Sequence, residues 1–217
     1  MSVEKKTCAA VIMASGTAER FGANKLLAVL DGRPVIEHTA DSVLRVFKGE
    51  DTPVLLMTRN PEIAELIRHD YPDASNLRVV LWGGGPQSET LRLAVQTLTE
   101  LPLKKQPDGC IFIAGDQPLI AESDLLNLLE VFKMRPAEDL SVIRLAFEGV
   151  PGNPVLWPSA YFDQLQALHG DKGGSQLLKG GKIPQVMVEA SSSASLLDID
   201  TPEDLQEAEK LLKIIQF

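Results

Sequence analysis

Cysteines, aromatic residues and long hydrophobic runs are all scarce in this sequence, and each shortage excludes a class of protein. Only two cysteines occur in 217 residues, Cys8 and Cys110, which is too few for a disulfide framework or a cysteine-rich metal cage. Each lies in an apolar run, so we expect both to be small buried residues of strands. No apolar stretch approaches the roughly 20 residues that a membrane-spanning helix needs. We therefore expect no association with a membrane.

An excess of basic residues is also missing. The chain has 21 Lys and Arg against 30 Asp and Glu, a formal net charge of −9 and a pI near 4.9. This balance argues against a nucleic-acid partner, because a protein that binds the phosphate backbone needs a basic face. A small anionic ligand is still compatible with it, since a few placed cations and a metal can invert the local field. Charged residues follow the first apolar run too closely for a signal peptide, so we expect a cytoplasmic location.

Apolar runs rich in Val and Ile alternate with segments in which apolar residues recur at helical spacing. The alternation predicts a single α/β domain, 1–217, with three α/β/α Rossmann-like layers around a mostly parallel mixed sheet. Strands are expected at 7–13, 53–58, 78–82, 109–114, 141–147, 154–157 and 183–188. Helices are expected at 34–47, from 61 onward, and at 88–101, 121–134, 159–168, 175–179 and 202–215.

Two local signals refine this pattern. The segment 149–152 is expected to be the turn between the strands at 141–147 and 154–157. The last helix has a complete start signal, with Thr201 as N-cap, Pro202 in the first position and Asp204 able to bond back to the cap.

The loop after the first strand combines small residues with two cations. Backbone N–H groups at Ala14, Ser15 and Gly16 can turn toward an anion and form a nest. Arg20 and Lys25 can then close on phosphate oxygens. The segment lacks the endings that define a Walker loop or a dinucleotide fingerprint. From spacing alone, a phosphate nest and a glycine-containing turn with two solvated cations both remain open.

Acidic residues follow the fourth strand and precede the last helix. Asp116 lies at a strand end, where it can hold Mg²⁺ against a triphosphate or simply start a turn. Asp198 and Asp200 alternate on an expected short strand. Asp200 is a candidate second metal carboxylate, although the neighbouring Thr201–Asp204 segment is already explained as a helix cap.

The three histidines share no metal-ligand spacing, so we expect no zinc site. Three further loops are turns by their composition alone. The loops cover 82–92, 149–154 and 170–174. The first enters a helix whose N-terminus could face a ligand, and the other two could contact an acceptor.

Taken together, these segments resemble the MobA-like nucleotidyltransferase family, most closely its molybdenum cofactor cytidylyltransferase branch. The resemblance spans Cys8 to about Lys213, with the motifs in the family's order. They are Ala14-Ser-Gly16 with Arg20-Phe-Gly22 and Asn24-Lys25-Leu-Leu27, then Ser88-Glu-Thr90-Leu-Arg92, Gly115-Asp116-Gln-Pro118, Gly149-Val-Pro-Gly-Asn-Pro154, Gly170-Asp-Lys-Gly173 and Asp198-Ile-Asp-Thr-Pro-Glu-Asp204. Ser15 stands where cytidylyl members usually carry Ala and guanylyl members Gly, which favours CTP. Asn153 stands where many cytidylyl relatives have His.

The resemblance implies a fold of the nucleotide-diphospho-sugar transferase type, with a nucleotide-binding half at about 7–135 and an acceptor-binding half at about 136–217. It implies Mg²⁺-dependent transfer of CMP from CTP to the phosphate of molybdopterin or its metal-loaded form, with release of pyrophosphate. The implied catalytic residues are Arg20, Lys25 and Asp116, and the implied metal ligands are Asp116 and Asp200. Nucleotide contacts are implied for Ala14, Ser15, Gly16, Thr17, Arg20, Lys25, Ser88, Thr90 and Gly115, and acceptor contacts for Gly152, Asn153, Pro154, Asp171 and Lys172.

The expected partners are small-molecule substrates and a molybdenum hydroxylase apoenzyme. Three alternatives stay open. The first is a nucleotidyltransferase that uses GTP or another phosphorylated acceptor, such as a sugar phosphate or an isoprenoid precursor. The second is a non-catalytic accessory protein that binds the cofactor. The third is an oxidoreductase, which no dinucleotide fingerprint supports.

Overall fold

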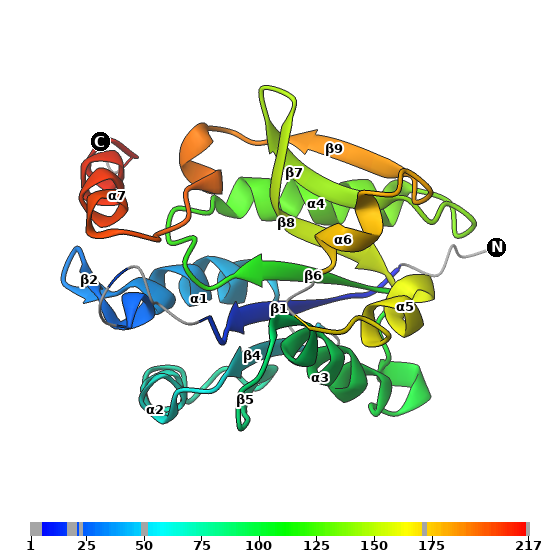
Figure 1. Ribbon diagram of the computed structural model, residues 1–217, viewed down its shortest axis with the longest axis horizontal. Coiled ribbons are helices and arrows are strands. Elements are labelled where there is room, and N and C mark those ends of the chain that lie inside the picture. Colours follow the sequence, from blue (N-terminus) through cyan, green and yellow to red (C-terminus); the bar gives the residue numbers. More distant parts are fainter. Residues whose placement is uncertain (1–5, 17–20, 22–23, 49–51, 171–172, 216–217) are drawn as a thin grey trace.

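A seven-stranded sheet in the order β5-β4-β1-β6-β8-β7-β9 forms the centre of the molecule (Figure 1). The structure is a computed structural model that describes residues 6–16, 21, 24–48, 52–170 and 173–215. The strands of this sheet are β1 (Cys8–Ala14), β4 (Val54–Thr58), β5 (Leu77–Leu81), β6 (Gly109–Ala114), β7 (Val142–Phe147), β8 (Val150–Pro158) and β9 (Gln185–Glu189). A separate two-stranded ribbon pairs β2 (Val29–Leu30) with β3 (Arg33–Pro34).

The direction of the strands confirms the predicted mostly parallel mixed sheet. β1 runs parallel to both β4 and β6, β4 to β5, and β7 to β9. β8 alone in this sheet runs against its neighbours, β6 and β7. The carboxyl ends of β5, β4, β1 and β6 therefore lie at one edge of the sheet, which is where open α/β sheets bind ligands.

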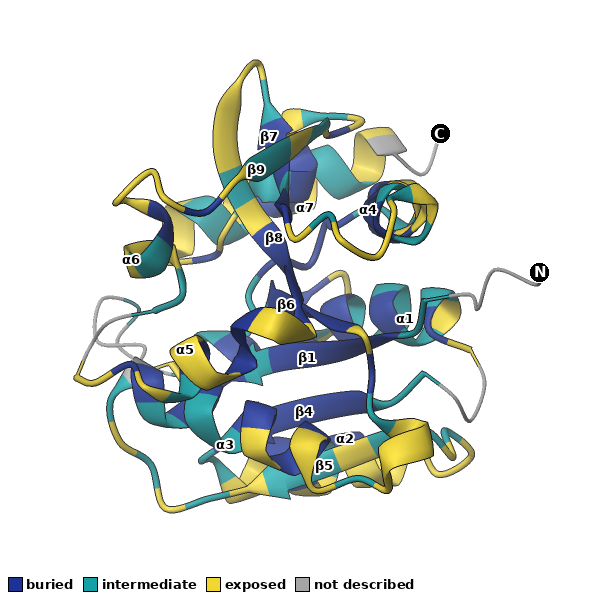
Figure 2. Ribbon diagram, turned by 90° about the vertical axis from the view of Figure 1, so that its right-hand side faces the viewer, coloured by how far each residue is buried: buried dark blue, intermediate teal, exposed yellow. Residues whose placement is uncertain are grey.

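Helices cover both faces of the sheet, as the three-layer prediction requires. They are α1 (Val35–Val46), α2 (Pro61–Asp70), α3 (Gln87–Thr99), α4 (Glu122–Met134), α5 (Phe162–Gln166), α6 (Ser175–Leu178) and α7 (Pro202–Ile215). Ala10 and Ile12 of β1 belong to the core with α1, α2 and α4, whereas Ala9 and Val11 belong to the core with α3, α5 and α6. Figure 2 shows β1 and β4 as buried strands between these layers. Burial on both sides explains why the central strands are continuously apolar in sequence.

Three expectations about local structure need correction, and one element was not predicted. Glu148 and Gly149, with φ of 51° and 77°, form the turn between β7 and β8, so most of the predicted 149–152 turn is already strand β8. The expected strand at 198–200 is wrong, because this segment has no strand pairing. The expected helix at 159–168 divides into a 3-10 turn (Ser159–Tyr161) followed by α5. The β2–β3 ribbon was missed, although Asp31-Gly32 at its turn is a recognised hairpin signal.

Other local predictions are confirmed. Cys8 and Cys110 are free and buried, and burial raises the pKa of Cys8 to about 12, so neither side chain is a reactive thiolate. The start of α7 is the predicted capping box. The backbone N–H of Thr201 donates to Asp204 Oδ2 (2.7 Å), and the backbone N–H of Asp204 donates to Thr201 Oγ1 (3.2 Å).

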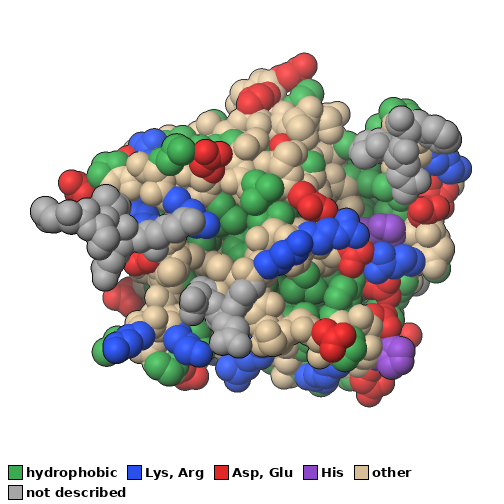
Figure 3. All heavy atoms as spheres, turned by 180° about the vertical axis from the view of Figure 1, so that it is seen from behind, with side chains coloured by type: hydrophobic (Ala, Val, Ile, Leu, Met, Phe, Trp, Pro, Cys, Tyr) green, Lys and Arg blue, Asp and Glu red, His purple; other side chains and the backbone are tan. Residues whose placement is uncertain are grey.

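None of the described helices is long and apolar enough to cross a membrane. On the face opposite that of Figure 1, basic and acidic side chains lie next to one another (Figure 3). Two ion pairs at and next to helix α1 are examples: Arg33 pairs with Asp41, and Arg45 pairs with Glu122.

The start of β6 has no room for a side chain. A Cβ on Gly109 would lie 2.6 Å from the Phe132 ring and 3.0 Å from the carbonyl oxygen of Trp157. We expect Gly109→Ala to lower the free energy of unfolding by about 1–3 kcal/mol, because the α4 core must shift to admit a methyl group. Urea denaturation measures this. Gly180→Ala is the control, since a Cβ there has nothing within 4 Å, and an equal loss in both variants would contradict the packing argument.

Candidate active site

The loop after β1, residues 15–24, carries implied nucleotide residues and is named the nucleotide loop for that reason. It begins beside the loop that follows β6 from Gly115, at the carboxyl end of the sheet. Met13 of β1 is in register with Ala114 of β6, and the backbone N–H of Gly115 donates to the carbonyl oxygen of Met13 (3.0 Å). A Cβ on Gly115 would lie 2.9 Å from Ile36 Cδ1 and 3.1 Å from Met13 O, so only glycine fits without movement. This close approach directs the next residue, Asp116, to the edge of the sheet.

Three charged residues from distant parts of the chain meet at this edge. Lys25 begins a 3-10 helix (Lys25–Leu27) that is capped by the side chain of Asn24. Its ammonium group contacts Asp116 Oδ2 and lies 2.6 Å from Asp200 Oδ1. The backbone N–H of Ile199 donates to the carbonyl oxygen of Asp116 (2.9 Å), which ties the Asp200 segment to the end of β6. The structure thus brings together all three described residues that the resemblance implicated in catalysis or metal binding.

The electrostatics of this group follow from the proximity of its charges. Burial alone would lower the pKa of Lys25, whose side chain is only 12% exposed, but the contacts with Asp116 and Asp200 outweigh it and raise the pKa above its usual value. Asp198 is exposed as a residue, yet desolvation of its carboxyl group, together with the charges of Asp116 and Asp200, raises its pKa to about 6. Sequence reasoning gave Asp198 no role, although its alternation with Asp200 was visible.

The donor set fits a divalent cation that binds together with a nucleotide. Within the described residues, no three His, Cys, Asp or Glu side chains are arranged to hold a metal by themselves. Asp116 and Asp200 nevertheless already share a cation, the ammonium group of Lys25. Mg²⁺ typically takes one or two carboxylates, and substrate phosphates and water complete its shell. Two carboxylates suffice for such a site if Lys25 moves to the phosphates.

The start of the nucleotide loop is tied to the neighbouring strands. The Ser15 hydroxyl donates to the carbonyl oxygen of Met57 (3.0 Å) and accepts from the indole N–H of Trp82 (3.0 Å). One residue earlier, the carbonyl oxygen of Ala14 accepts from Thr58 Oγ1 (3.1 Å). Gly16 follows and is exposed. The sequence analysis assigned Trp82 no role. The feature that could have indicated one is its position, a large aromatic residue between a strand and three glycines.

Other implied nucleotide residues are placed differently or lie outside the description. Ser88 and Thr90 lie in the first turn of α3 with only 2% exposure each, so their side chains are packed into the fold. The backbone N–H of Ser88 donates to the carbonyl oxygen of Gly170 (3.3 Å), which brings two of the predicted loops into contact. Thr17 and Arg20, together with the implied acceptor residues Asp171 and Lys172, lie outside the described residues.

A cavity of about 300 Å³ adjoins the same end of the sheet. Two implied acceptor residues line it, Gly152 and Asn153 of β8, together with Met13 and Ala114 from the ends of β1 and β6. Pro154, the third, is not among its lining residues. A Cβ on Gly152 would come within 2.2 Å of Leu196 Cδ2, so this glycine lets β8 pass close to the segment that leads to Asp200.

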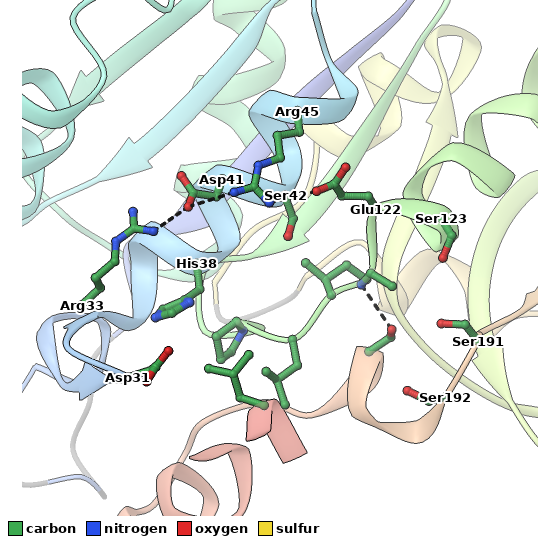
Figure 4. A pocket seen from close by; sticks show the side chains of 16 residues that line it. Asp31, Arg33, His38, Asp41, Ser42, Arg45, Glu122, Ser123, Ser191 and Ser192 are labelled. Atoms are coloured by element: carbon green, nitrogen blue, oxygen red, sulfur yellow. Dashed lines mark hydrogen bonds and ion pairs between the residues drawn. The ribbon is translucent and has the colours of Figure 1, made fainter. Parts of the chain in front are cut away.

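A second cavity, of about 640 Å³, lies between α1, the start of α4 and the 191–195 segment (Figure 4). Four of its charged side chains are paired, since Arg33 contacts Asp41 at 2.6 Å and Arg45 contacts Glu122 at 3.0 Å. The Ser195 hydroxyl accepts from the backbone N–H of Ala121. None of the described residues that the resemblance implied for substrate or metal binding lines this larger space.

Comparison with known proteins agrees with the geometry. The model of the MobA-like NTP transferase domain matches residues 10–187. The chain belongs to this family. The matched region contains β1 from Ala10 onward, the nucleotide loop, Lys25 and Asp116, whereas Asp200 lies beyond it.

Relatives that match most of the chain have different names. The purine catabolism protein PucB of Bacillus subtilis (strain 168) is 27% identical over 89% of this chain and 92% of its own. A probable molybdenum cofactor guanylyltransferase of Natranaerobius thermophilus is 25% identical over 94% and 95%. A 2-C-methyl-D-erythritol 4-phosphate cytidylyltransferase of Dehalococcoides mccartyi (strain CBDB1) is 26% identical over 94% and 95%.

The fold is shared with solved structures as well. A nucleotidyl transferase from Methanothermobacter thermautotroptrophicus superimposes with a TM-score of 0.75 at 22% identity, covering 96% of this chain and 99% of that one. Membership of the MobA-like family gives nucleotidyl transfer as the reaction class. One of the named relatives is a probable guanylyltransferase and another is a cytidylyltransferase, so the family alone does not choose the nucleotide.

The hydroxyl of Ser15 connects three strand ends, so its removal has a defined cost. We expect Ser15→Ala to lower the free energy of unfolding by about 1 kcal/mol, because Met57 O and Trp82 Nε1 lose a partner. Urea denaturation gives the stability, and the tryptophan emission spectrum reports the changed environment of Trp82. Ser193→Ala, at an exposed serine, is the control. A Ser15→Ala variant as stable as this control would contradict the proposed anchoring.

Proposed function

We propose that this chain transfers CMP from CTP to the phosphate of molybdopterin, or of its metal-loaded form, in a Mg²⁺-dependent reaction that releases pyrophosphate. The observation that carries the proposal is the meeting of Lys25, Asp116 and Asp200 at the carboxyl end of the sheet. In cells, the product would serve the maturation of a molybdenum hydroxylase in the cytoplasm.

The reaction needs positioning and neutralised charge more than covalent chemistry by the protein. An oxygen of the acceptor phosphate attacks the α-phosphorus in line, and the bond between the α-phosphorus and the α–β bridging oxygen breaks, so that pyrophosphate leaves. Bound Mg²⁺ supplies neutralisation of phosphate charge. Asp116 and Asp200 would hold the ion. Lys25 would exchange its carboxylate partners for the β- and γ-phosphates, where Arg20 is proposed to join it.

The net charge of −9 does not oppose this arrangement. The field that a nucleotide meets comes from nearby groups, and these are Lys25, Arg20 and the metal. The tie from Ser15 to Met57 and Trp82 holds the first residue after β1 in place before the ligand arrives. A residue that is already held reduces the conformational entropy that binding must overcome.

The choice of CTP rests on Ser15. A hydroxymethyl group at this position takes space that a glycine would leave open, which favours the smaller pyrimidine base. The names of related proteins are compatible with either GTP or CTP as the substrate, since one is a probable guanylyltransferase and another a cytidylyltransferase. GTP with the same acceptor is therefore the second candidate.

The acceptor half of the proposal is supported by the cavity that Gly152 and Asn153 line beside the end of β6. Molybdopterin follows from the resemblance and agrees with the name of the guanylyltransferase relative. The name of the erythritol phosphate relative supports another phosphorylated acceptor as one alternative. A role in which the cofactor is bound without turnover is the alternative from another functional class.

Nucleotide choice is tested by thermal unfolding with Mg²⁺ and each of CTP, GTP, ATP and UTP. A nucleotide at a hundred times its Kd stabilises the chain by about 2.7 kcal/mol, or roughly 5–10 °C for a domain of this size. We expect this shift with CTP and not with the others. A shift with GTP alone would move the product to a guanylyl cofactor, and no shift with any nucleotide would contradict the nucleotidyltransferase site.

The metal site is tested by removing one negative charge without changing shape. We expect Asp116→Asn to abolish pyrophosphate release from CTP and molybdopterin while leaving the melting temperature without ligand close to that of the unmodified chain. Asp73→Asn, at an exposed turn, is the matched control and should keep full turnover. Full activity in a folded Asp116→Asn variant would remove Asp116 from the reaction.

A further inference from the structure

On the acceptor side of the sheet lies an arginine, Arg144, that has no acidic partner among the described residues. Arg144 is in the middle of β7 and is in register with Val155 of β8, which is in register with Phe112 of β6. Residues in register across neighbouring strands point to the same face of a sheet, so Arg144 continues a row of apolar side chains. Phe112 and Val155 belong to the core beneath α3, α5 and α6, and Arg144 therefore points to that face.

The contacts of the Arg144 guanidinium are few and long. Nη1 lies 3.5 Å from Gln185 Oε1, and Nη2 lies 3.4 Å from the carbonyl oxygen of Gly152. Both exceed the usual 2.7–3.2 Å of such hydrogen bonds. Nε is buried without any partner, and no carboxylate in the described part of the chain pairs with this arginine. The guanidinium thus keeps most of its capacity to bind an anion.

Arg144 lines the cavity of about 300 Å³ beside the end of β6. The side chains of Phe112, Trp157 and Leu91 make part of its wall apolar and aromatic, and Asn153 adds a polar amide. Ala114, another lining residue, precedes Asp116 by two positions, at most about 7 Å of extended chain. A ligand that fits these walls has an apolar or planar body and an anionic group.

We propose that Arg144 binds the phosphate of the acceptor through its guanidinium fork, while the body of the acceptor packs against Phe112 and Trp157. The proposal rests on the proposed function and specifies the acceptor as an organic phosphate. Arg144 is a positioning residue that holds the attacking phosphate next to the strand end where Asp116 lies. A planar fork of N–H donors suits this task, because it bonds two phosphate oxygens at once.

A purely structural role explains these observations less well. Desolvation lowers the pKa of Arg144, and no carboxylate among the residues that the structure describes compensates for it. A cation in such a position reduces stability and is normally paired. β7 is bonded on both sides, to β8 and to β9, so the guanidinium is presented from a rigid strand.

Phenyl phosphate is a suitable probe, since it joins an aromatic body to a phosphate and needs no nucleotide. We expect it to bind the unmodified chain, with quenching of tryptophan fluorescence because Trp157 lines the cavity. Arg144→Met should weaken binding by roughly 10–100-fold, the value of a hydrogen-bonded charge pair, and Arg144→Lys should lose less. The control is Arg78→Met, the same change at an exposed arginine of β5, and it should leave the affinity unchanged.

Two further measurements separate the outcomes. The melting temperature of Arg144→Met should equal or exceed that of the unmodified chain, whereas a structural arginine would give a clear loss. The Mg²⁺-nucleotide shift should persist in Arg144→Met, since this residue serves the acceptor and not the nucleotide. Failure of every nucleotide to stabilise the unmodified chain would count against the proposed function and not against the phosphate site.

Three results would overturn the role of Arg144. They are no binding of phenyl phosphate by the unmodified chain, equal affinity in Arg144→Met, and loss of the nucleotide shift in Arg144→Met.

Discussion

The ammonium group of Lys25 lies between two carboxylates, Asp116 and Asp200, and the geometry of the site depends on this contact. Two carboxylates brought this close repel each other unless a cation lies between them. The cation compensates for that repulsion and connects three segments, the nucleotide loop, the end of β6 and the approach to α7. A lysine can be exchanged for a metal because its charge sits on a flexible stem. The same pair of acids can then be held by lysine in one state and can hold a metal in another.

The pairing of strands β1 and β6 determines where the segments that carry Lys25 and Asp116 begin. β1 and β6 are parallel neighbours with matched register, so their carboxyl ends stop together and their loops start from adjacent points. Burial of both faces of β1, with Ala9 and Val11 on one side and Ala10 and Ile12 on the other, leaves the strand no freedom to slip. Gly115 then permits the close approach of the two backbones, and this places the next residue, Asp116, at the carboxyl edge of the sheet.

Polar groups at the site differ in how fully they are satisfied. Ser15 both donates its hydroxyl to the carbonyl oxygen of Met57 and accepts from the indole N–H of Trp82, which fixes the position of Ser15 at the end of β1. Within the part of the chain that the structure describes, Arg144 has only long contacts and a buried Nε without a partner. A polar group with hydrogen-bond partners stabilises the free protein. A buried polar group without partners lowers the stability of the free protein, but it can still bind a ligand. This contrast assigns the first to the framework and makes the second a candidate for ligand recognition.

Local information in the sequence was enough to determine the α/β class, most strands and helices, the burial of Cys8 and Cys110, and the capping box at Thr201. These features depend on periodicity, burial and short-range hydrogen bonds, all of which involve residues close together in the chain. The spacing also identified Lys25, Asp116 and Asp200 as separate candidates. Their meeting, the tie from Trp82 to Ser15 and the isolation of Arg144 were decided only by the tertiary structure. Each of these depends on which strands are neighbours and in what register. Pairing between segments far apart in the chain has no signature in the residues next to each segment, so it cannot be predicted from local sequence.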